Sequence, residues 1–174
     1  QWLINRKEFE INKIKLLYVG RVRKEKGIYS LLSLIKEIKL DLTLSIVGSE
    51  KNSLDQIIQD NVHVYKVENN EKNLIKFYDD HNIFVLPSYT EGHPMVLLEA
   101  LSRLRPVIIF KDIEHVVGNK KGIFIAERSS SSFLEKINYI TKNYKNIQEE
   151  MKKNNLPTKE AFLLKLSDLI LKSN

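Results

Sequence analysis

Two glutamates, Glu91 and Glu99, have the spacing and the surroundings that best suggest a binding site. Glu91 belongs to a loop with Gly92 and His93. Glu99 belongs to a segment that is predicted to form a helix from Pro94, because proline is tolerated in a first helical turn. The two carboxylates could hold separated parts of one polyhydroxylated ligand. Free N–H groups of the first helical turn would face an anion beside them, namely those of Met95, Val96 and Leu97.

Each of these residues also has a simpler explanation. Glu99 alone could be a solvent-facing helix residue. Glu91 alone could be a loop acid that stabilises the positive end of the helix dipole by about 0.3–1 kcal/mol. His93 could contact a ligand or be a bystander, so the spacing by itself leaves both interpretations open.

A second candidate is the basic segment between Gly20 and Gly27, which follows an apolar run and precedes an amphipathic helix. Its backbone N–H groups and the side chains of Arg21 and Lys26 could surround a phosphate. Six residues separate the glycines and no Lys-Ser or Lys-Thr pair follows, so the segment does not match a Walker loop. It also lacks the Gly-x-Gly-x-x-Gly pattern of dinucleotide sites. A basic surface loop is the alternative.

These loops interrupt a regular alternation of strands and helices. Short apolar runs predict six strands, at residues 16–19, 42–47, 62–67, 83–86, 107–110 and 122–126. Helices are predicted at 27–38, 53–59, 71–81, 94–104 and 129–142, with a short turn or helix at 113–117. Nearly continuous apolar strands are typical of a parallel sheet buried on both faces. The predicted fold class is therefore α/β: a Rossmann-like doubly wound parallel sheet of about six strands, with helices on both faces and a C-terminal helix.

With 174 residues the chain has room for one domain. We expect this domain at residues 15–155, after a linker or added strand at 1–14. Residues 156–174 are expected to form a C-terminal amphipathic helix, which either packs on its own sheet or reaches a further domain. Because the chain begins at Gln1 rather than Met, we expect a fragment of a longer protein.

Composition excludes several classes of site. The absence of cysteine rules out disulfides, zinc–thiolate sites and thiol nucleophiles, and no apolar run approaches the roughly 20 residues of a membrane helix. The net charge of +6 suits a phosphate-bearing ligand or peripheral contact with an anionic membrane. Aromatic residues are not interleaved with the basic ones, which argues against nucleic acid. No Asp-x-Asp occurs and residues 79–81 are interpreted as a helix cap, so no metal is expected.

Taken in order, the motifs resemble the C-terminal, donor-binding domain of a family-4 (group-1) glycosyltransferase of the two-Rossmann-domain (GT-B) architecture. The resemblance rests on the first strand and basic loop (17–21, 25–27), the second strand and its glycine (46–48), the Glu-x7-Glu signature (91–99), and the later blocks at Pro106, Glu114 and Gly122. It covers residues 15–172. It implies that residues 15–155 bind a nucleotide sugar and that the N-terminal acceptor domain is absent from this chain.

The resemblance assigns roles to the basic loop and the helix start. Arg21 and Lys26, in the loop that begins at Gly20, would hold the diphosphate of a nucleotide-diphosphate sugar. The helix N–H groups of Met95 and Val96 would lie beside it.

The two glutamates would bind the other parts of the donor. Glu99 would accept hydrogen bonds from the ribose, and Glu91 would hold the donor sugar together with the N–H groups of Gly92 and His93. The base would lie beyond the third strand, near two residues, Val67 and Glu68.

The implied reaction is a retaining, metal-independent transfer of a sugar to a saccharide or lipid-linked acceptor in surface polysaccharide synthesis. Its catalytic residues would be Glu91, Arg21 and Lys26, and no cofactor is implied. The acceptor would bind through the N-terminal domain, so the isolated domain would bind the donor but hardly turn it over. The expected location is the cytoplasm, including the inner face of the membrane.

The chain departs from the family pattern in three places. Residues 49–51 replace a glycine and a proline, Leu104 and Arg105 stand where a small residue and a glycine are common, and the loop before Glu114 is shortened to residues 111–113. These departures keep open a non-catalytic nucleotide-binding or interaction domain of the same fold. A nucleotide-sugar epimerase is a further alternative, although no motif for it is evident.

Overall fold

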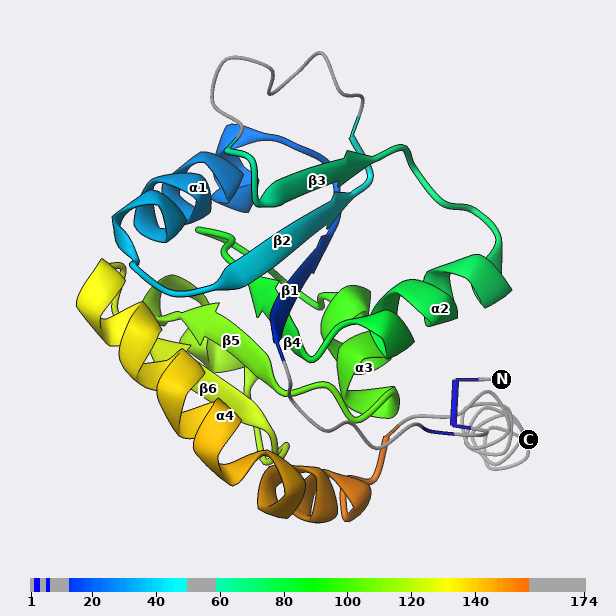
Figure 1. The fold of residues 1–174 in the computed structure, drawn as a ribbon. Coiled ribbons are helices and arrows are strands. Elements are labelled where there is room, and N and C mark those ends of the chain that lie inside the picture. The colour runs from blue at the N-terminus through cyan, green and yellow to red at the C-terminus, as the bar shows by residue number, and fades with distance from the viewer. Residues whose placement is uncertain (1, 4–5, 7–12, 50–58, 157–174) are drawn as a thin grey trace, which may run out of the picture.

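Six parallel strands form the centre of the molecule (Figure 1). The computed structural model describes residues 2–3, 6, 13–49 and 59–156. Within them the strands are β1 Ile14–Val19, β2 Leu42–Val47, β3 Val62–Tyr65, β4 Ile83–Leu86, β5 Val107–Phe110 and β6 Ile123–Ala126. Their order across the sheet is β3-β2-β1-β4-β5-β6, and every neighbouring pair is parallel. The prediction of a Rossmann-like, doubly wound α/β sheet is confirmed.

Helices lie on both faces of this sheet, as predicted. The helices α1 Ile28–Glu37 and α4 Ser130–Lys152 cover one face, and α2 Glu71–Asp80 and α3 Met95–Ser102 cover the other (Figure 1). Because both faces are covered, β4 and β5 are buried at every residue, which explains their continuous apolar runs. The edge strand β3 is partly exposed and ends at Tyr65, before its predicted end at residue 67.

Helix α4 is longer than its sequence pattern predicts. Ser129 caps its start as expected, since the Ser129 hydroxyl accepts a hydrogen bond from the N–H of Ser132. The predicted end at Lys142 directly precedes a non-helical residue, Asn143 (φ −113°, ψ 16°), but the helix continues beyond this kink. The continuation buries further side chains against the domain, among them Tyr144, Ile147 and Met151.

Helix α3 is shorter than predicted. Pro94 precedes the helix in an extended conformation (φ −73°, ψ 106°), and the last helical residue is Ser102. Leu104 then takes a positive φ of 59°, which costs a non-glycine residue about 1–2 kcal/mol. The buried Leu104 side chain and a hydrogen bond from Gln148 Nε2 to the Leu104 carbonyl (3.0 Å) hold this turn in place.

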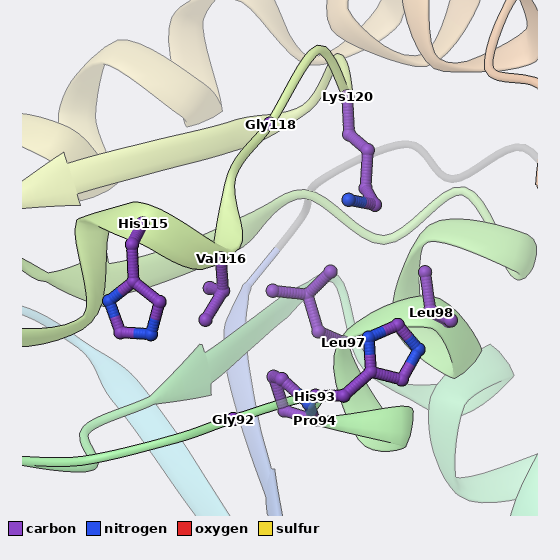
Figure 2. A pocket seen from close by; sticks show the side chains of 9 residues that line it. All are labelled: Gly92, His93, Pro94, Leu97, Leu98, His115, Val116, Gly118 and Lys120. Atoms are coloured by element: carbon purple, nitrogen blue, oxygen red, sulfur yellow. The ribbon is translucent and has the colours of Figure 1, made fainter.

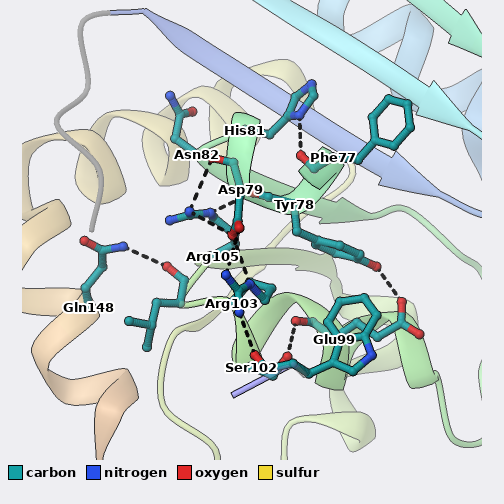
Figure 3. A network of polar contacts seen from close by, with 12 residues as sticks. Phe77, Tyr78, Asp79, His81, Asn82, Glu99, Ser102, Arg103, Arg105 and Gln148 are labelled. Atoms are coloured by element: carbon teal, nitrogen blue, oxygen red, sulfur yellow. Dashed lines mark hydrogen bonds and ion pairs between the residues drawn. The ribbon is translucent and has the colours of Figure 1, made fainter. Parts of the chain in front are cut away.

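Asp79, near the end of α2, forms a buried ion pair instead of capping the helix. Its Oδ1 and Oδ2 accept hydrogen bonds from Nε and Nη2 of Arg103 at 2.9 and 2.8 Å, and Nη2 of Arg105 lies 3.6 Å from Oδ1 (Figure 3). Arg103 and Arg105 are only 2% and 1% exposed. The expected cap at residues 79–81 is therefore limited to His81, which ends the helix. Asp79 instead joins the end of α2 to the turn after α3.

Several sequence predictions lie outside the described residues. They concern the helix at 53–59, most of the segment 1–14 and the helix at 156–174, so the domain boundaries stay predictions. Near the N-terminus, the Trp2 ring packs edge-on against Tyr78 with ring centroids 5.5 Å apart. No helix in the described part of the chain is long and apolar enough to cross a membrane.

Candidate functional site

The carboxyl ends of β1 and β4 flank a cavity of about 360 Å³. These two strands are neighbours at the point where the sequence order of the sheet reverses, which is where doubly wound sheets bind ligands. The walls come from the end of β1 and its loop, from the loop after β4 and from the start of α3. The lining residues are Tyr18, Val19, Gly20, Arg21, Lys26, Leu86, Glu91, His93, Pro94, Met95 and Val96. They include every residue predicted to hold the diphosphate and two of those predicted to hold the sugar.

Glu91 is fixed in this cavity by two donors. Lys26 Nζ lies 2.7 Å from Glu91 Oε1, and the Ser88 hydroxyl donates to the same oxygen at 2.6 Å. The Glu91 side chain is 11% exposed and that of Lys26 is 28% exposed, so the pair is only partly screened by water. Within the described residues Oε2 of Glu91 makes no hydrogen bond, which leaves it available to a ligand hydroxyl.

Gly27 allows the basic loop to approach the loop that carries Glu91. It has a φ of +66°, and a Cβ atom there would lie 1.9 Å from the carbonyl oxygen of Pro87. The two loops are also joined by a hydrogen bond from the N–H of Tyr89 to the carbonyl of Glu25, at 2.9 Å. The Lys26–Glu91 pair therefore depends on a position that only glycine fits.

Arg128, which follows β6, holds the other side of the Glu91 loop. Its Nη1 donates to the Pro87 carbonyl at 3.0 Å and its Nη2 to Asp112 Oδ2 at 2.7 Å. The guanidinium also lies 3.9 Å from the centroid of the Tyr89 ring, a distance at which cation–π attraction is effective. Arg128 was not predicted from the sequence, although its place in the loop after the last strand was a usable signal.

Tyr18 supports the basic loop from the end of β1 and was also missed. Its hydroxyl donates to the Arg21 carbonyl at 2.9 Å. Burial, and next the nearby Glu91 carboxylate, raise the pKa of Tyr18 well above its ordinary value. The hydroxyl therefore stays protonated and keeps its bond to Arg21.

Glu99 lies beside the main cavity rather than in its wall. It lines an adjoining cavity of about 160 Å³ together with Met95, which borders both. The Tyr78 hydroxyl donates to Glu99 Oε2 at 2.8 Å (Figure 3). Burial raises the pKa of Glu99, and this hydrogen bond offsets part of the increase. The carboxylate is thus half-buried and oriented, unlike a solvent-facing helix residue.

The structure does not bring Val67 and Glu68 into the cavity wall. Val67 is 62% exposed beyond the end of β3. The Glu68 carboxylate accepts hydrogen bonds from the N–H of Asn70 (2.7 Å) and from Nδ2 of Asn73 (3.2 Å), which tie it to the start of α2. Their assignment to the base of a nucleotide stays a prediction.

A third cavity, of about 190 Å³, adjoins the main one (Figure 2). It contains Gly92 in its wall, and His93 and Pro94 border both cavities. Each residue predicted to hold the sugar therefore lines at least one of the two cavities: Glu91 the main one, Gly92 the third, and His93 both. Among the described residues, no three histidine, aspartate or glutamate side chains are grouped as a metal ion would need.

The chain belongs to the family of glycosyl transferases group 1, whose model matches residues 3–158. The capsular polysaccharide biosynthesis glycosyltransferase CapM of Staphylococcus aureus is 31% identical over 132 residues, which are 69% of this chain and 34% of CapM. The chain thus spans about a third of the length of the curated relatives it matches.

Solved structures share the fold. Sucrose-phosphate synthase from Thermosynechococcus elongatus superposes with a TM-score of 0.73 at 22% identity, over 92% of this chain and 45% of that protein. The Anabaena protein HepE, solved in complex with UDP and glucose, superposes with a TM-score of 0.64 at 15% identity, over 80% of this chain and 42% of HepE. At these identities the likeness shows the Rossmann-like half of the GT-B architecture and nothing finer.

Proposed function

We propose that this chain binds the nucleotide-diphosphate sugar donor of a glycosyltransferase and supplies the donor half of its active site. The observation that carries the proposal is the cavity between β1 and β4, in which Arg21 and Lys26 meet Glu91 and the start of α3. Membership of the glycosyl transferase group 1 family supports it. The presence of UDP and glucose in a structural neighbour agrees with a donor of this class.

In this proposal the donor lies across the ends of β1 and β4. Arg21 and Lys26 bind the diphosphate, and the N–H groups at the start of α3, including those of Met95 and Val96, add the positive end of the helix dipole. Glu99 accepts from the ribose hydroxyls, and the base extends toward two residues beyond β3, Val67 and Glu68. Lys26 serves both the diphosphate and Glu91, so it couples the two halves of the donor.

The proposed reaction exchanges one bond at the sugar C1. The bond from C1 to the diphosphate oxygen breaks, a bond from an acceptor oxygen forms with retention of configuration, and the acceptor proton leaves with the diphosphate. Arg21, Lys26 and the helix N–H groups stabilise the negative charge that develops on the diphosphate, so no metal or cofactor is required. Glu91 orients the sugar through its free Oε2 and acts by positioning.

The acceptor is a saccharide or lipid-linked saccharide, which a further domain presents to the donor. We assign the reaction to surface polysaccharide synthesis, because the relative CapM is named for capsular polysaccharide biosynthesis. We propose that the reaction takes place in the cytoplasm. The net charge of +6 would allow contact with the inner face of the membrane.

Calorimetric titration with UDP, GDP and ADP, each bare and sugar-linked, tests the proposal. One base should bind saturably, and Arg21→Ala should weaken that binding by about 10- to 100-fold, since charge-assisted hydrogen bonds contribute about 1.5–3 kcal/mol. Arg23→Ala is the matched control, because Arg23 faces Glu25 at 3.7 Å and lies outside the cavity wall. Absence of binding across the panel, or equal loss in both variants, would contradict the proposal.

Glu99 should make nucleotide binding sensitive to mild acid. A nucleotide binds the charged carboxylate, and the raised pKa of Glu99 means that protonation begins at a higher pH than for an ordinary glutamate of pKa 4.5. Affinity for a nucleotide sugar should therefore fall as the pH is lowered toward 5, and Glu99→Gln should bind more weakly with a flatter pH profile. Titrations between pH 7.5 and 5 measure this difference. Parallel profiles in the two proteins would refute the role of Glu99.

A further inference from the structure

The 190 Å³ cavity beside the proposed donor site is bordered by one lysine and two histidines (Figure 2). Three basic or titratable side chains border it, those of His93, His115 and Lys120, and the remainder of the wall is glycine, proline and aliphatic. No aspartate or glutamate side chain is part of this lining. Lys120 therefore brings to this space a positive charge that no carboxylate of the lining neutralises.

Neither Lys120 nor His93 forms an ion pair with a carboxylate among the residues that the structure describes. In the described part of the chain, Lys120 Nζ has one polar contact, the Val117 carbonyl at 3.5 Å, which is the outer limit of a hydrogen bond. His93 has no hydrogen-bond partner within the same residues. Figure 2 shows the two side chains extending from opposite walls of the cavity. By contrast, Lys26 in the main cavity is already paired with Glu91 at 2.7 Å.

His115 connects this cavity to the loop that carries Glu91. Its Nε2 lies 2.8 Å from the Glu91 carbonyl oxygen, and because a carbonyl can only accept, Nε2 is the donor. His115 belongs to the compact 3₁₀ segment Lys111–Val116 after β5. The shortened loop thus closes directly on the Glu91 loop and leaves Lys120, from the following turn, to cover the cavity.

The position of the cavity matches the sugar end of the proposed donor. His93 and Pro94 border both spaces, so a ligand whose diphosphate lies at Arg21 and Lys26 can extend past Glu91 into the 190 Å³ cavity. Its volume of about 190 Å³ equals about six water molecules at roughly 30 Å³ each. This volume suits one monosaccharide and is too small to hold a nucleotide in addition to the sugar.

We infer that the donor sugar of this protein carries a carboxylate, as a hexuronic acid does, and that Lys120 and His93 bind it in this cavity. The inference rests on the proposed function, because it places the diphosphate in the adjoining cavity. A neutral sugar would leave the Lys120 charge without a counterion, whereas a carboxylate in place of the terminal hydroxymethyl group would form a charge-assisted pair with it.

Paired nucleotide sugars that differ only at this carbon provide the test. The chain is titrated calorimetrically with UDP-glucose and UDP-glucuronate, UDP-galactose and UDP-galacturonate, and GDP-mannose and GDP-mannuronate. For the base that binds, the acidic sugar should bind about tenfold more tightly or better. Lys120→Met should remove most of this preference while binding of the bare nucleotide changes less than about twofold. The neighbouring Lys121→Met is the matched control, since Lys121 lies outside this lining and should keep the preference.

The outcomes separate the two claims. Equal binding of the acidic and neutral sugars, or a preference that Lys120→Met leaves intact, would overturn the inference and leave the proposed function standing. A further titration adds free glucuronate to the chain in the presence of UDP. If free glucuronate then binds as tightly as UDP-glucuronate does, the cavity is an anion site unrelated to the donor sugar, and the inference is also overturned. If no nucleotide or nucleotide sugar binds, the proposed function fails and the inference fails with it. Thermal denaturation of both variants checks that each is folded.

Discussion

Asp79→Ala is expected to lower the free energy of unfolding by about 3–5 kcal/mol, because it removes one partner of a buried ion pair. Arg103 would lose both of its hydrogen bonds to this carboxylate, at 2.9 and 2.8 Å, and Arg105 would lose a carboxylate oxygen at 3.6 Å. Both guanidinium groups would stay in a site that is almost closed to water. Urea unfolding followed by circular dichroism measures the loss.

The adjacent Asp80 provides the control for this prediction. It is partly exposed and pairs with the exposed Lys76 one helical turn away, and surface pairs of this kind contribute about 0–1 kcal/mol. Asp80→Ala should therefore change the unfolding free energy by less than about 1 kcal/mol. Asp79→Asn, which keeps one acceptor oxygen, should fall between the two alanine variants. Similar losses in Asp79→Ala and Asp80→Ala would show that the buried pair does not stabilise the fold.

Gly27→Ala should impair both stability and donor binding. The left-handed backbone alone costs alanine about 1–2 kcal/mol, and the new methyl group would lie 1.9 Å from the Pro87 carbonyl oxygen. The loops must separate to relieve this overlap, which breaks the 2.7 Å contact between Lys26 and Glu91. We expect the affinity for a nucleotide sugar to fall by about tenfold or more, since a charge-assisted contact is lost.

Gly92→Ala is the control for the close contact between a Cβ at residue 27 and the Pro87 carbonyl oxygen. No atom lies within 4 Å of a Cβ built at Gly92, so this substitution should change the unfolding free energy by no more than about 0.5 kcal/mol. Thermal and urea unfolding of the two variants, with titration of Gly27→Ala, measure the contrast. A Gly27→Ala protein that is as stable as Gly92→Ala and binds with parental affinity would disprove the packing argument.

Local sequence patterns predicted the elements of this fold well where burial is complete. The strands β4 and β5 are buried on both faces and read as uninterrupted apolar runs, so their bounds match the prediction. The pattern was least accurate at the exposed end of β3 and beyond the kink at Asn143 in α4, where only one face of the helix is buried. At such places the apolar residues become sparse, and packing decides where an element ends.

Some residues of the candidate site could likewise be predicted from local sequence patterns, and others could not. Glu91, Arg21 and Lys26 could be named from the sequence, because each lies in a loop after a buried strand, and parallel strands bring those loops to one edge. Tyr18 and Tyr78 could not be named with them, since each acts through a contact that only the folded chain creates. Arg128 could have been named, because it also lies in a loop after a strand.

The sequence by itself determined the α/β alternation, the parallel sheet and the loops that carry the charged residues, since these depend on periodicity and local chemistry. Only the tertiary structure decided that Lys26 pairs with Glu91, that Asp79 faces two buried arginines, and that Lys120 and His93 share a cavity. These pairings join residues 24 to 65 positions apart in the chain. Their energies depend on distance and burial, which no local pattern contains.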